Sequence, residues 1–214
     1  VEVEDKVAHV LINRPDKINS MNADFWREIT EIFHWADVTD GVRAVVISGA
    51  GKHFSSGMDL MVLAGLGSQL GTDPGRNALN LRRKIMEFQE SFTAIERCAK
   101  PVLAAIHGYC LGGAIDLIAA CDMRYSTLDA QFSIKEIDIG MAADVGTLQR
   151  MPHLIGDGMV RELAEGGMTV LWSTAYLDEA ELCDHVLLMA DGEVRTSGTP
   201  AGLMGAMASR CWLL

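Results

Sequence analysis

The spacing of apolar residues predicts that the chain opens with a strand followed by a helix. In residues 7–12, VAHVLI, one set of alternate positions holds Val7, His9 and Leu11 and the other holds Ala8, Val10 and Ile12, as in an extended segment, and Arg14-Pro15 closes this stretch. Asn22 is a suitable N-cap, because the next apolar residues recur at helical spacing: Phe25, Ile29, Ile32, Phe33 and Ala36. We therefore expect a strand over 7–12 and an amphipathic helix that starts after Asn22.

A second strand and a second helix follow. Residues 43–48, RAVVIS, have the composition of a buried strand and lead into the glycine-containing loop 49–60, GAGKHFSSGMDL. The glycine-rich stretch 65–76 then separates this loop from a helix that we expect to end at Lys100-Pro101. Its apolar face consists of Leu81, Ile85, Phe88, Phe92 and Ile95.

The next part of the chain predicts strand, turn, helix and strand again. Residues 101–109, PVLAAIHGY, form the expected strand; Gly112-Gly113 forms the turn, a helix starts near residue 114, and residues 123–127, MRYST, form the last strand. Strands that alternate with helices indicate the α/β class. The glycine order does not match the dinucleotide-binding pattern of a Rossmann fold.

One carboxylate, Asp116, stands in the apolar run CLGGAIDLIAACD, residues 110–122. A strand that ends at Gly112-Gly113 and turns at once into a helix exposes free N–H groups at the positive end of that helix. Glycine leaves room for a ligand carbonyl to approach the backbone. Asp116 is thus either a residue that acts on such a ligand or a first-turn acid favoured by the helix dipole.

Two further acids lie amid apolar or glycine residues. Glu136 and Asp144 both fall in the stretch SIKEIDIGMAADVGTLQR, residues 133–150. Carboxylates in apolar surroundings are costly unless they are paired, hydrogen bonded or functional. Taken singly, each is more simply explained as an exposed or hydrogen-bonded acid.

Composition narrows the function classes. The formal net charge of −11 and the absence of a basic stripe argue against nucleic-acid binding. The five cysteines form no C-x-x-C pair, so we expect reduced core thiols and no metal site. The apolar run 102–120 is interrupted by polar and glycine residues, which predicts a buried strand and helix and no membrane insertion. VEVEDKVAHV lacks the features of a signal peptide, and we expect a cytoplasmic protein.

Three blocks over residues 1–163 resemble the enoyl-CoA hydratase/isomerase (crotonase) superfamily, and within it the delta(3,5)-delta(2,4)-dienoyl-CoA isomerases. The blocks are HFSSGMDL (53–60), KPVLAAIHGYCLGGAIDLIAACDMRY (100–125) and AQFSIKEIDIGMAADVGTLQRMPHLIG (130–156). The resemblance implies a crotonase-like spiral of β-β-α turns as the fold. It also implies an acyl-CoA thioester as substrate, with no cofactor besides the coenzyme A of the substrate, and a homotrimer or hexamer.

The resemblance also assigns residues to the site. The N–H groups of Met58 and Gly113 correspond to the oxyanion hole for the thioester oxygen. The coenzyme A portion would lie along a segment with Ser56, Gly57 and Asp59, next to Gly112. The catalytic acids would be Asp116, Glu136 and Asp144.

Hydratases of this superfamily have glutamates at the positions of Asp116 and Glu136. The third acid, Asp144, distinguishes the dienoyl isomerases from them. The resemblance thus implies a shift of a 3,5-dienoyl-CoA to a 2,4-dienoyl-CoA, with Glu136 serving C2 and Asp144 serving C6. The alternatives are a general enoyl-CoA hydratase/isomerase and an inactive acyl-CoA binder.

Residues 165–203 resemble the last part of an ABC transporter ATPase domain, which predicts a second segment, 164–214, after a core of 1–163. The pattern comprises strand 168–174, helix 177–184 and strand 185–194, followed by a turn at Gly198-Thr199-Pro200. No Walker A loop precedes it, so this segment is not expected to hydrolyse ATP.

Overall fold

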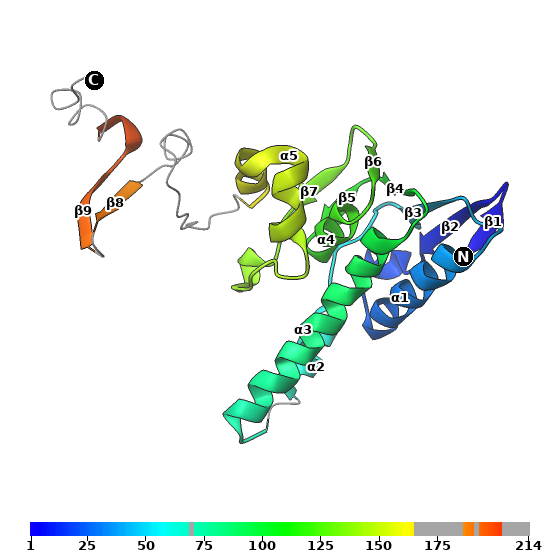
Figure 1. Ribbon diagram of the computed structural model, residues 1–214, viewed down its shortest axis with the longest axis horizontal. Helices are drawn as coiled ribbons and strands as arrows, with labels where there is room; N and C mark the ends of the chain where they lie inside the picture. Colours follow the sequence, from blue (N-terminus) through cyan, green and yellow to red (C-terminus); the bar gives the residue numbers. More distant parts are fainter. Residues whose placement is uncertain (69–70, 165–185, 191–192, 203–214) are drawn as a thin grey trace. The chain divides into compact units, whose positions relative to one another are not determined.

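The computed structural model describes residues 1–68, 71–164, 186–190 and 193–202. The chain divides into two units, Val1–Met168 and Thr169–Leu214. The first unit contains every residue that the sequence assigns to the site (Figure 1).

A five-stranded sheet forms the centre of the first unit. Its order is β1-β2-β3-β4-β6, with β1 antiparallel to β2 and the other pairs parallel. Buried residues alternate with exposed ones along β2 and with half-buried ones along β4, so one face of the sheet contributes most to the core. The strands are β1 Glu2–Glu4, β2 Val7–Ile12, β3 Ala44–Gly49, β4 Val102–Ile106 and β6 Met123–Ser126.

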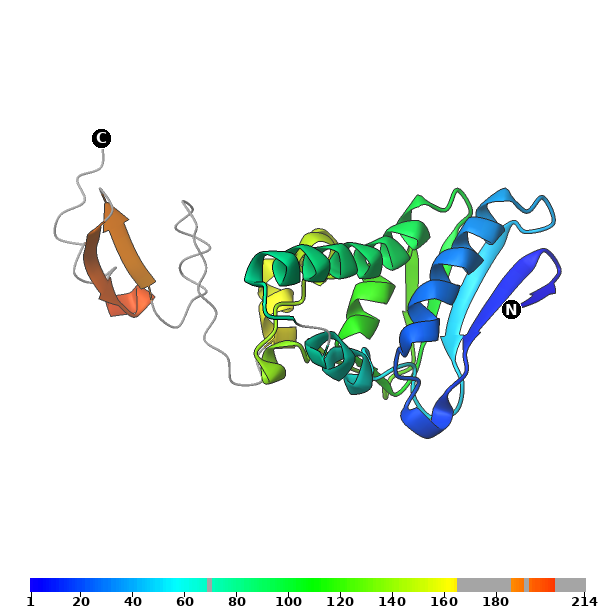
Figure 2. The same cartoon turned by 90° about the horizontal axis from the view of Figure 1, so that it is seen from below.

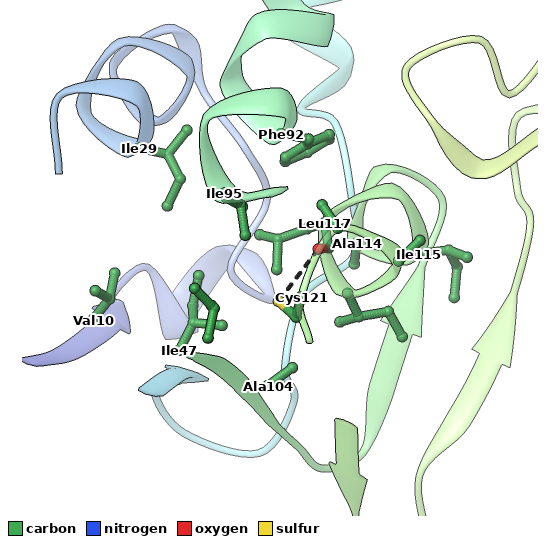
Figure 3. Close-up of a cluster of buried hydrophobic side chains, with 14 of the residues drawn as sticks. Val10, Ile29, Ile47, Phe92, Ile95, Ala104, Ala114, Ile115, Leu117 and Cys121 are labelled. Atoms are coloured by element: carbon green, nitrogen blue, oxygen red, sulfur yellow. Dashed lines mark hydrogen bonds between the residues drawn. The ribbon is translucent and has the colours of Figure 1, made fainter. Parts of the chain in front are cut away.

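Two amphipathic helices pack on each other beside this sheet (Figure 2). Helix α1 spans Ala23–Val38, and the Asn22 side chain caps it by accepting a hydrogen bond from Phe25 N–H at 3.0 Å. Helix α3 spans Pro74–Arg97 and is capped by Asp73. Their buried side chains form one core with those of the sheet and α4 (Figure 3). Both predicted helices are thus confirmed.

A smaller sheet and two more helices complete the first unit. Strand β5, Tyr109–Leu111, pairs in parallel with β7, Gln131–Ser133, and leads into helix α4, Gly113–Ala119. Helix α5, Thr147–Ala164, packs against α4 and is kinked at Gly156. The short helices η1 and η2 cover Pro15–Lys17 and Ile137–Ile139.

Two boundaries differ from the sequence prediction. The stretch 65–76 is not simply a separator, because helix α2, Leu60–Ser68, includes its first residues and α3 already begins at Pro74. The strand expected over 101–109 ends at Ile106, since residues 109–111 pair with β7 in the other sheet. Pairing partners distant in the sequence decide this break, and apolar spacing does not show them.

In the second unit, strand β8, Val186–Ala190, pairs antiparallel with β9, Glu193–Gly198. The prediction of one continuous strand over 185–194 is therefore wrong, because this range belongs to two antiparallel strands. The strand predicted over 168–174 and the helix over 177–184 lie outside the described residues. Of the helices that the structure describes, none has the length and apolar character needed to cross a membrane.

Candidate active site

The two backbone N–H groups assigned to the oxyanion hole lie side by side. A Cβ atom placed on Gly113 would be 3.6 Å from Met58 N, and one on Gly57 would be 2.8 Å from Gly113 N. Within the described part of the chain, neither the Met58 nor the Gly113 N–H donates to a protein acceptor. The structure thus brings together segments 55 residues apart and leaves two donors free.

A backbone bridge orients the Met58 donor. Met21 N–H donates to Gly57 O at 2.8 Å, and Asp59 N–H donates to Met21 O at 3.1 Å. Because the C=O and N–H of one trans peptide group point to opposite sides, and Gly57 O points toward Met21, the Met58 N–H points away from Met21. The bridge therefore fixes the direction of one of the two donors.

Gly113 presents its N–H at the first turn of α4. The preceding residue, Gly112, has φ 54° and ψ −128°, a conformation that only glycine adopts without strain. Its own N–H donates to Ser133 O at 2.9 Å, so strand β7 holds this turn. The turn predicted at these glycines is confirmed, and a thioester oxygen that accepts from both free N–H groups would be stabilised as it gains negative charge.

Asp116 lies one turn further into α4 and is fully buried. Its Oδ1 accepts a hydrogen bond from Thr147 N–H at 2.5 Å, while its Oδ2 has no hydrogen bond partner among the described residues. Burial raises the pKa of Asp116 to about 7, and the negative charges of Glu136 and Asp144 push it in the same direction. This carboxyl group can therefore gain or lose a proton near neutral pH.

Glu136 lies against the glycine turn. A Cβ atom on Gly112 would be 3.1 Å from Glu136 Oε1. The other oxygen, Oε2, is buried without a hydrogen bond partner among the residues described. Burial raises the pKa of Glu136, and the charge of Asp144 raises it further. A carboxylate with a raised pKa is a stronger base than one in water, and this one lies next to the turn that presents the free Gly113 N–H.

Asp144 is half-buried in the loop before α5, and helix α3 holds that loop. Gln89 Nε2 on α3 donates to the backbone oxygen of Asp144 at 2.8 Å. The negative charge of Asp144 raises the pKa of both Glu136 and Asp116. The three acids expected from the sequence therefore lie close enough to influence each other, although up to 28 residues separate them along the chain.

Comparison with known proteins shows the family to which the chain belongs. The model of the enoyl-CoA hydratase/isomerase family matches residues 2–175. The chain belongs to this family. It is 55% identical over 159 residues to the mitochondrial delta(3,5)-delta(2,4)-dienoyl-CoA isomerase of Mus musculus, a match that covers 73% of this chain and 49% of that protein.

Two further similarities extend the comparison. The peroxisomal delta(3,5)-delta(2,4)-dienoyl-CoA isomerase of Arabidopsis thaliana is 42% identical over 217 residues, covering 94% of this chain and 78% of that protein. The crystal structure of an enoyl-CoA hydratase/isomerase from Marinobacter aquaeolei superposes with a TM-score of 0.70 at 26% identity, covering 79% of this chain and 63% of that one. The expected α/β crotonase-like fold is thus confirmed.

The chain spans about half the length of the mouse relative, 49%.

The matches also bear on two expectations from the sequence, the C-terminal segment and the location. The family match runs past residue 163 and the Arabidopsis alignment covers 94% of the chain, so the comparisons do not support an ABC transporter ATPase segment. The relatives are named as mitochondrial or peroxisomal proteins, which does not support the expected cytoplasmic location.

Two residues that support the candidate site were missed by sequence reasoning. Asn19 is fully buried, and its Nδ2 donates to Ala50 O and His53 O, both at 2.8 Å. Ser55 Oγ donates to Asn19 O at 2.8 Å and accepts from Gly57 N–H at 3.1 Å. Together they hold the loop that carries Met58. Short polar residues in a glycine-rich loop are common, so no sequence signal singled them out.

The predicted substrate-binding residues Ser56 and Asp59 lie in the same loop as Gly57. Ser56 N–H donates to Ile18 O at 2.9 Å. Asp59 forms an ion pair with Arg14 at 3.1 Å and accepts a hydrogen bond from Met61 N–H at 3.0 Å. The Met61 N–H and the Arg14 guanidinium hold the pKa of Asp59 below its usual value. The carboxylate of Asp59 thus joins this loop to the end of β2.

Among the described residues, no group of three or more His, Cys, Asp or Glu side chains could hold a metal ion. Cys110 and Cys121 are buried free thiols, and burial raises the pKa of Cys121 to about 12. These two cysteines pack in the core, as the sequence predicted.

Proposed function

We propose that this chain carries the catalytic site of an acyl-CoA isomerase that converts a 3,5-dienoyl-CoA to a 2,4-dienoyl-CoA. The observation that carries the proposal is the pair of free N–H groups, Met58 and Gly113, beside three acids, Asp116, Glu136 and Asp144. Support comes from the relatives with this name, at 42% to 55% identity.

The first chemical step is removal of a proton from C2 of the acyl group. The electron pair moves into the conjugated system, and negative charge develops on the thioester oxygen, where the N–H groups of Met58 and Gly113 receive it. One such donor is typically worth about 3 to 4 kcal/mol of transition-state stabilisation. We assign Glu136 as the base, because its carboxylate lies next to Gly112 and its pKa is raised.

The second step adds a proton to C6. Protonation at C6 of the trienolate from the first step leaves double bonds at positions 2 and 4 in place of those at 3 and 5, so one proton leaves and one enters. We assign Asp144 as the acid. Asp116 would tune the protonation of the pair, since its charge and that of Glu136 repel each other in a buried site.

The coenzyme A portion of the substrate would lie along the loop of Ser56, Gly57 and Asp59, next to Gly112. In this proposal coenzyme A arrives with the substrate, and the chemistry needs no other cofactor. We further propose assembly into a homotrimer or hexamer, which light scattering coupled to gel filtration would test.

The test is to incubate purified protein with a 3,5-dienoyl-CoA and, separately, with a simple 2-enoyl-CoA. We expect absorbance to rise with the dienoyl substrate, as the diene becomes conjugated with the thioester carbonyl. If only the simple 2-enoyl-CoA reacts, with loss of its absorbance, the result would favour a hydratase. Thioester binding without either change would favour an inactive acyl-CoA binder. Either of these last two results would overturn the proposal.

A further inference from the structure

Gln89 contacts the backbone of the acid that the proposed mechanism assigns to C6. Its Nε2 donates to the backbone oxygen of Asp144 at 2.8 Å, across 55 positions of the chain. Gln89 is a half-buried residue of helix α3, whereas Asp144 lies in a turn before helix α5. Because a turn has no helical or sheet ladder around it, the place of Asp144 depends on side-chain contacts such as this one.

Helix α3 holds the segment around Asp144 at a second point as well. Gln89, Thr93 and Glu96 recur at a spacing that places them on one face of this helix. The guanidinium of Arg150, in the first turn of α5, donates to Thr93 Oγ1 at 3.4 Å and to Glu96 Oε2 at 2.7 Å. The same guanidinium lies against Gly146. One face of α3 therefore contacts the loop both at the acid and just after it.

We propose that Gln89 is a positioning residue for Asp144: by holding the backbone oxygen, it fixes the direction in which the carboxyl group leaves the chain. This inference rests on the proposed function, in which Asp144 delivers the proton to C6. The Asp144 N–H donates to Ala142 O at 2.9 Å, so Gln89 supplies the contact on the carbonyl side of the residue. A reactive group that is displaced by about 1 Å can lose on the order of 100-fold in rate.

The other two acids are held by different contacts. Asp116 belongs to helix α4, and its Oδ1 accepts a hydrogen bond from Thr147 N–H. The carboxyl group of Glu136 lies against Gly112. Loss of the Gln89 side chain should therefore disturb the acid assigned to C6 and leave the base assigned to C2 in place. The two proton transfers should respond differently, which general damage to the fold would not produce.

The test uses variants of the full chain. Gln89→Met removes the donor and keeps an unbranched side chain of similar length. Gln89→Leu removes the same donor with a shorter side chain, in case methionine is not accommodated. Gln149→Met is the matched control, because Gln149 is an exposed glutamine in the first turn of α5.

The first readout is the division of the trienolate between its two fates in deuterated water. Return of a deuteron to C2 gives back labelled 3,5-dienoyl-CoA, whereas addition of a deuteron to C6 gives the 2,4-dienoyl-CoA. Mass spectrometry of both species at partial conversion measures the ratio of C2 exchange to isomerisation. We expect both Gln89 variants to isomerise about tenfold more slowly or worse, and this ratio to rise by a similar factor. The dissociation constant for an acyl-CoA should not change, and Gln149→Met should behave as wild type.

The second readout needs no turnover. Amide hydrogen exchange, followed by mass spectrometry, compares the loop 140–146 with strand β2 in wild type and in each variant. We expect the loop amides of the Gln89 variants to exchange about fivefold faster, the factor for loss of one hydrogen bond, and those of β2 to stay unchanged. Gln149→Met should leave both segments as in wild type.

Two results would overturn the inference. One is a ratio of C2 exchange to isomerisation that stays at the wild-type value in the Gln89 variants, even if their overall activity falls. The other is unchanged amide exchange of the loop 140–146. A wild type that does not isomerise the dienoyl-CoA would refute the proposed function, while the amide exchange would still decide whether Gln89 holds Asp144 in place.

Discussion

Gly57 packs directly on the backbone of Gly113, so that a Cβ atom at residue 57 would lie 2.8 Å from Gly113 N. The same atom would lie 2.5 Å from Leu111 O. Both distances are shorter than real Cβ contacts allow. The close approach of the two proposed oxyanion donors, the N–H groups of Met58 and Gly113, therefore depends on the absence of a side chain at this position.

Gly57→Ala should separate the two donors. Residue 57 has φ +80°, which adds backbone strain to the steric conflict. We expect kcat to fall about 100-fold or more, since one oxyanion donor typically contributes that much. The measurement is steady-state turnover of a dienoyl-CoA. Gly158→Ala in α5 is the matched control, because a Cβ there has no neighbour within 4 Å, and a similar loss in this control would contradict the account.

Glu136→Gln should abolish the proposed base and keep its shape. We expect turnover to fall by orders of magnitude while the dissociation constant for an acyl-CoA stays nearly unchanged, because coenzyme A contacts are assigned elsewhere. Calorimetry and a turnover assay on the same preparation would measure both. The control is Asp138→Asn, since Asp138 is exposed and pairs with Lys135 at 2.7 Å. Full activity of Glu136→Gln would remove this step of the mechanism.

Asp116→Asn should stabilise the protein above neutral pH. The pKa of Asp116 is raised to about 7, so the unfolded chain ionises this group at lower pH than the folded chain does. Wild type therefore loses stability as pH rises from about 4 through about 7, by an upper bound of about 4 kcal/mol for a shift of about three units. Chemical unfolding at pH 5 and pH 8 would measure it. An equal effect of the substitution at both pH values would refute the assignment.

Asn19→Ala should destabilise the loop that carries Met58. The substitution removes the donor to Ala50 O and His53 O, and also the Asn19 Oδ1 that accepts from Arg14 N–H at 2.9 Å. We expect a loss of about 2 to 4 kcal/mol in the free energy of unfolding, because buried backbone groups are left without partners. Asn22→Ala, which removes only the α1 cap, should cost about 1 kcal/mol. Equal losses in the two variants would argue against the central role of Asn19.

The sequence predicted those parts of the molecule that local chemistry decides. The spacing from Phe25 to Ala36 gave the position of α1, and Asn22 is its cap. The turn at Gly112-Gly113 was expected from residue type. The match of the acids and oxyanion segments to a family depended on resemblance, because nothing in the spacing of Asp116, Glu136 and Asp144 alone shows that they meet.

The parts that the sequence did not predict depend on contacts between distant segments. The roles of Asn19 and Ser55 arise from hydrogen bonds to residues 31 to 36 positions away, which no local pattern encodes. Thr147 was likewise unremarkable until the structure placed its N–H on Asp116. The break between β4 and β5 follows from pairing with β7. Local periodicity carries no information on such partners.

The most direct test of the account is isomerisation in deuterated water, followed by location of the label in the product. If Glu136 takes the proton from C2 and Asp144 delivers one to C6, the 2,4-dienoyl-CoA should carry deuterium at C6. Asp144→Asn should abolish formation of this labelled product. Deuterium at C4 instead, or unchanged labelling of C6 by Asp144→Asn, would contradict the proposed division of roles between these acids.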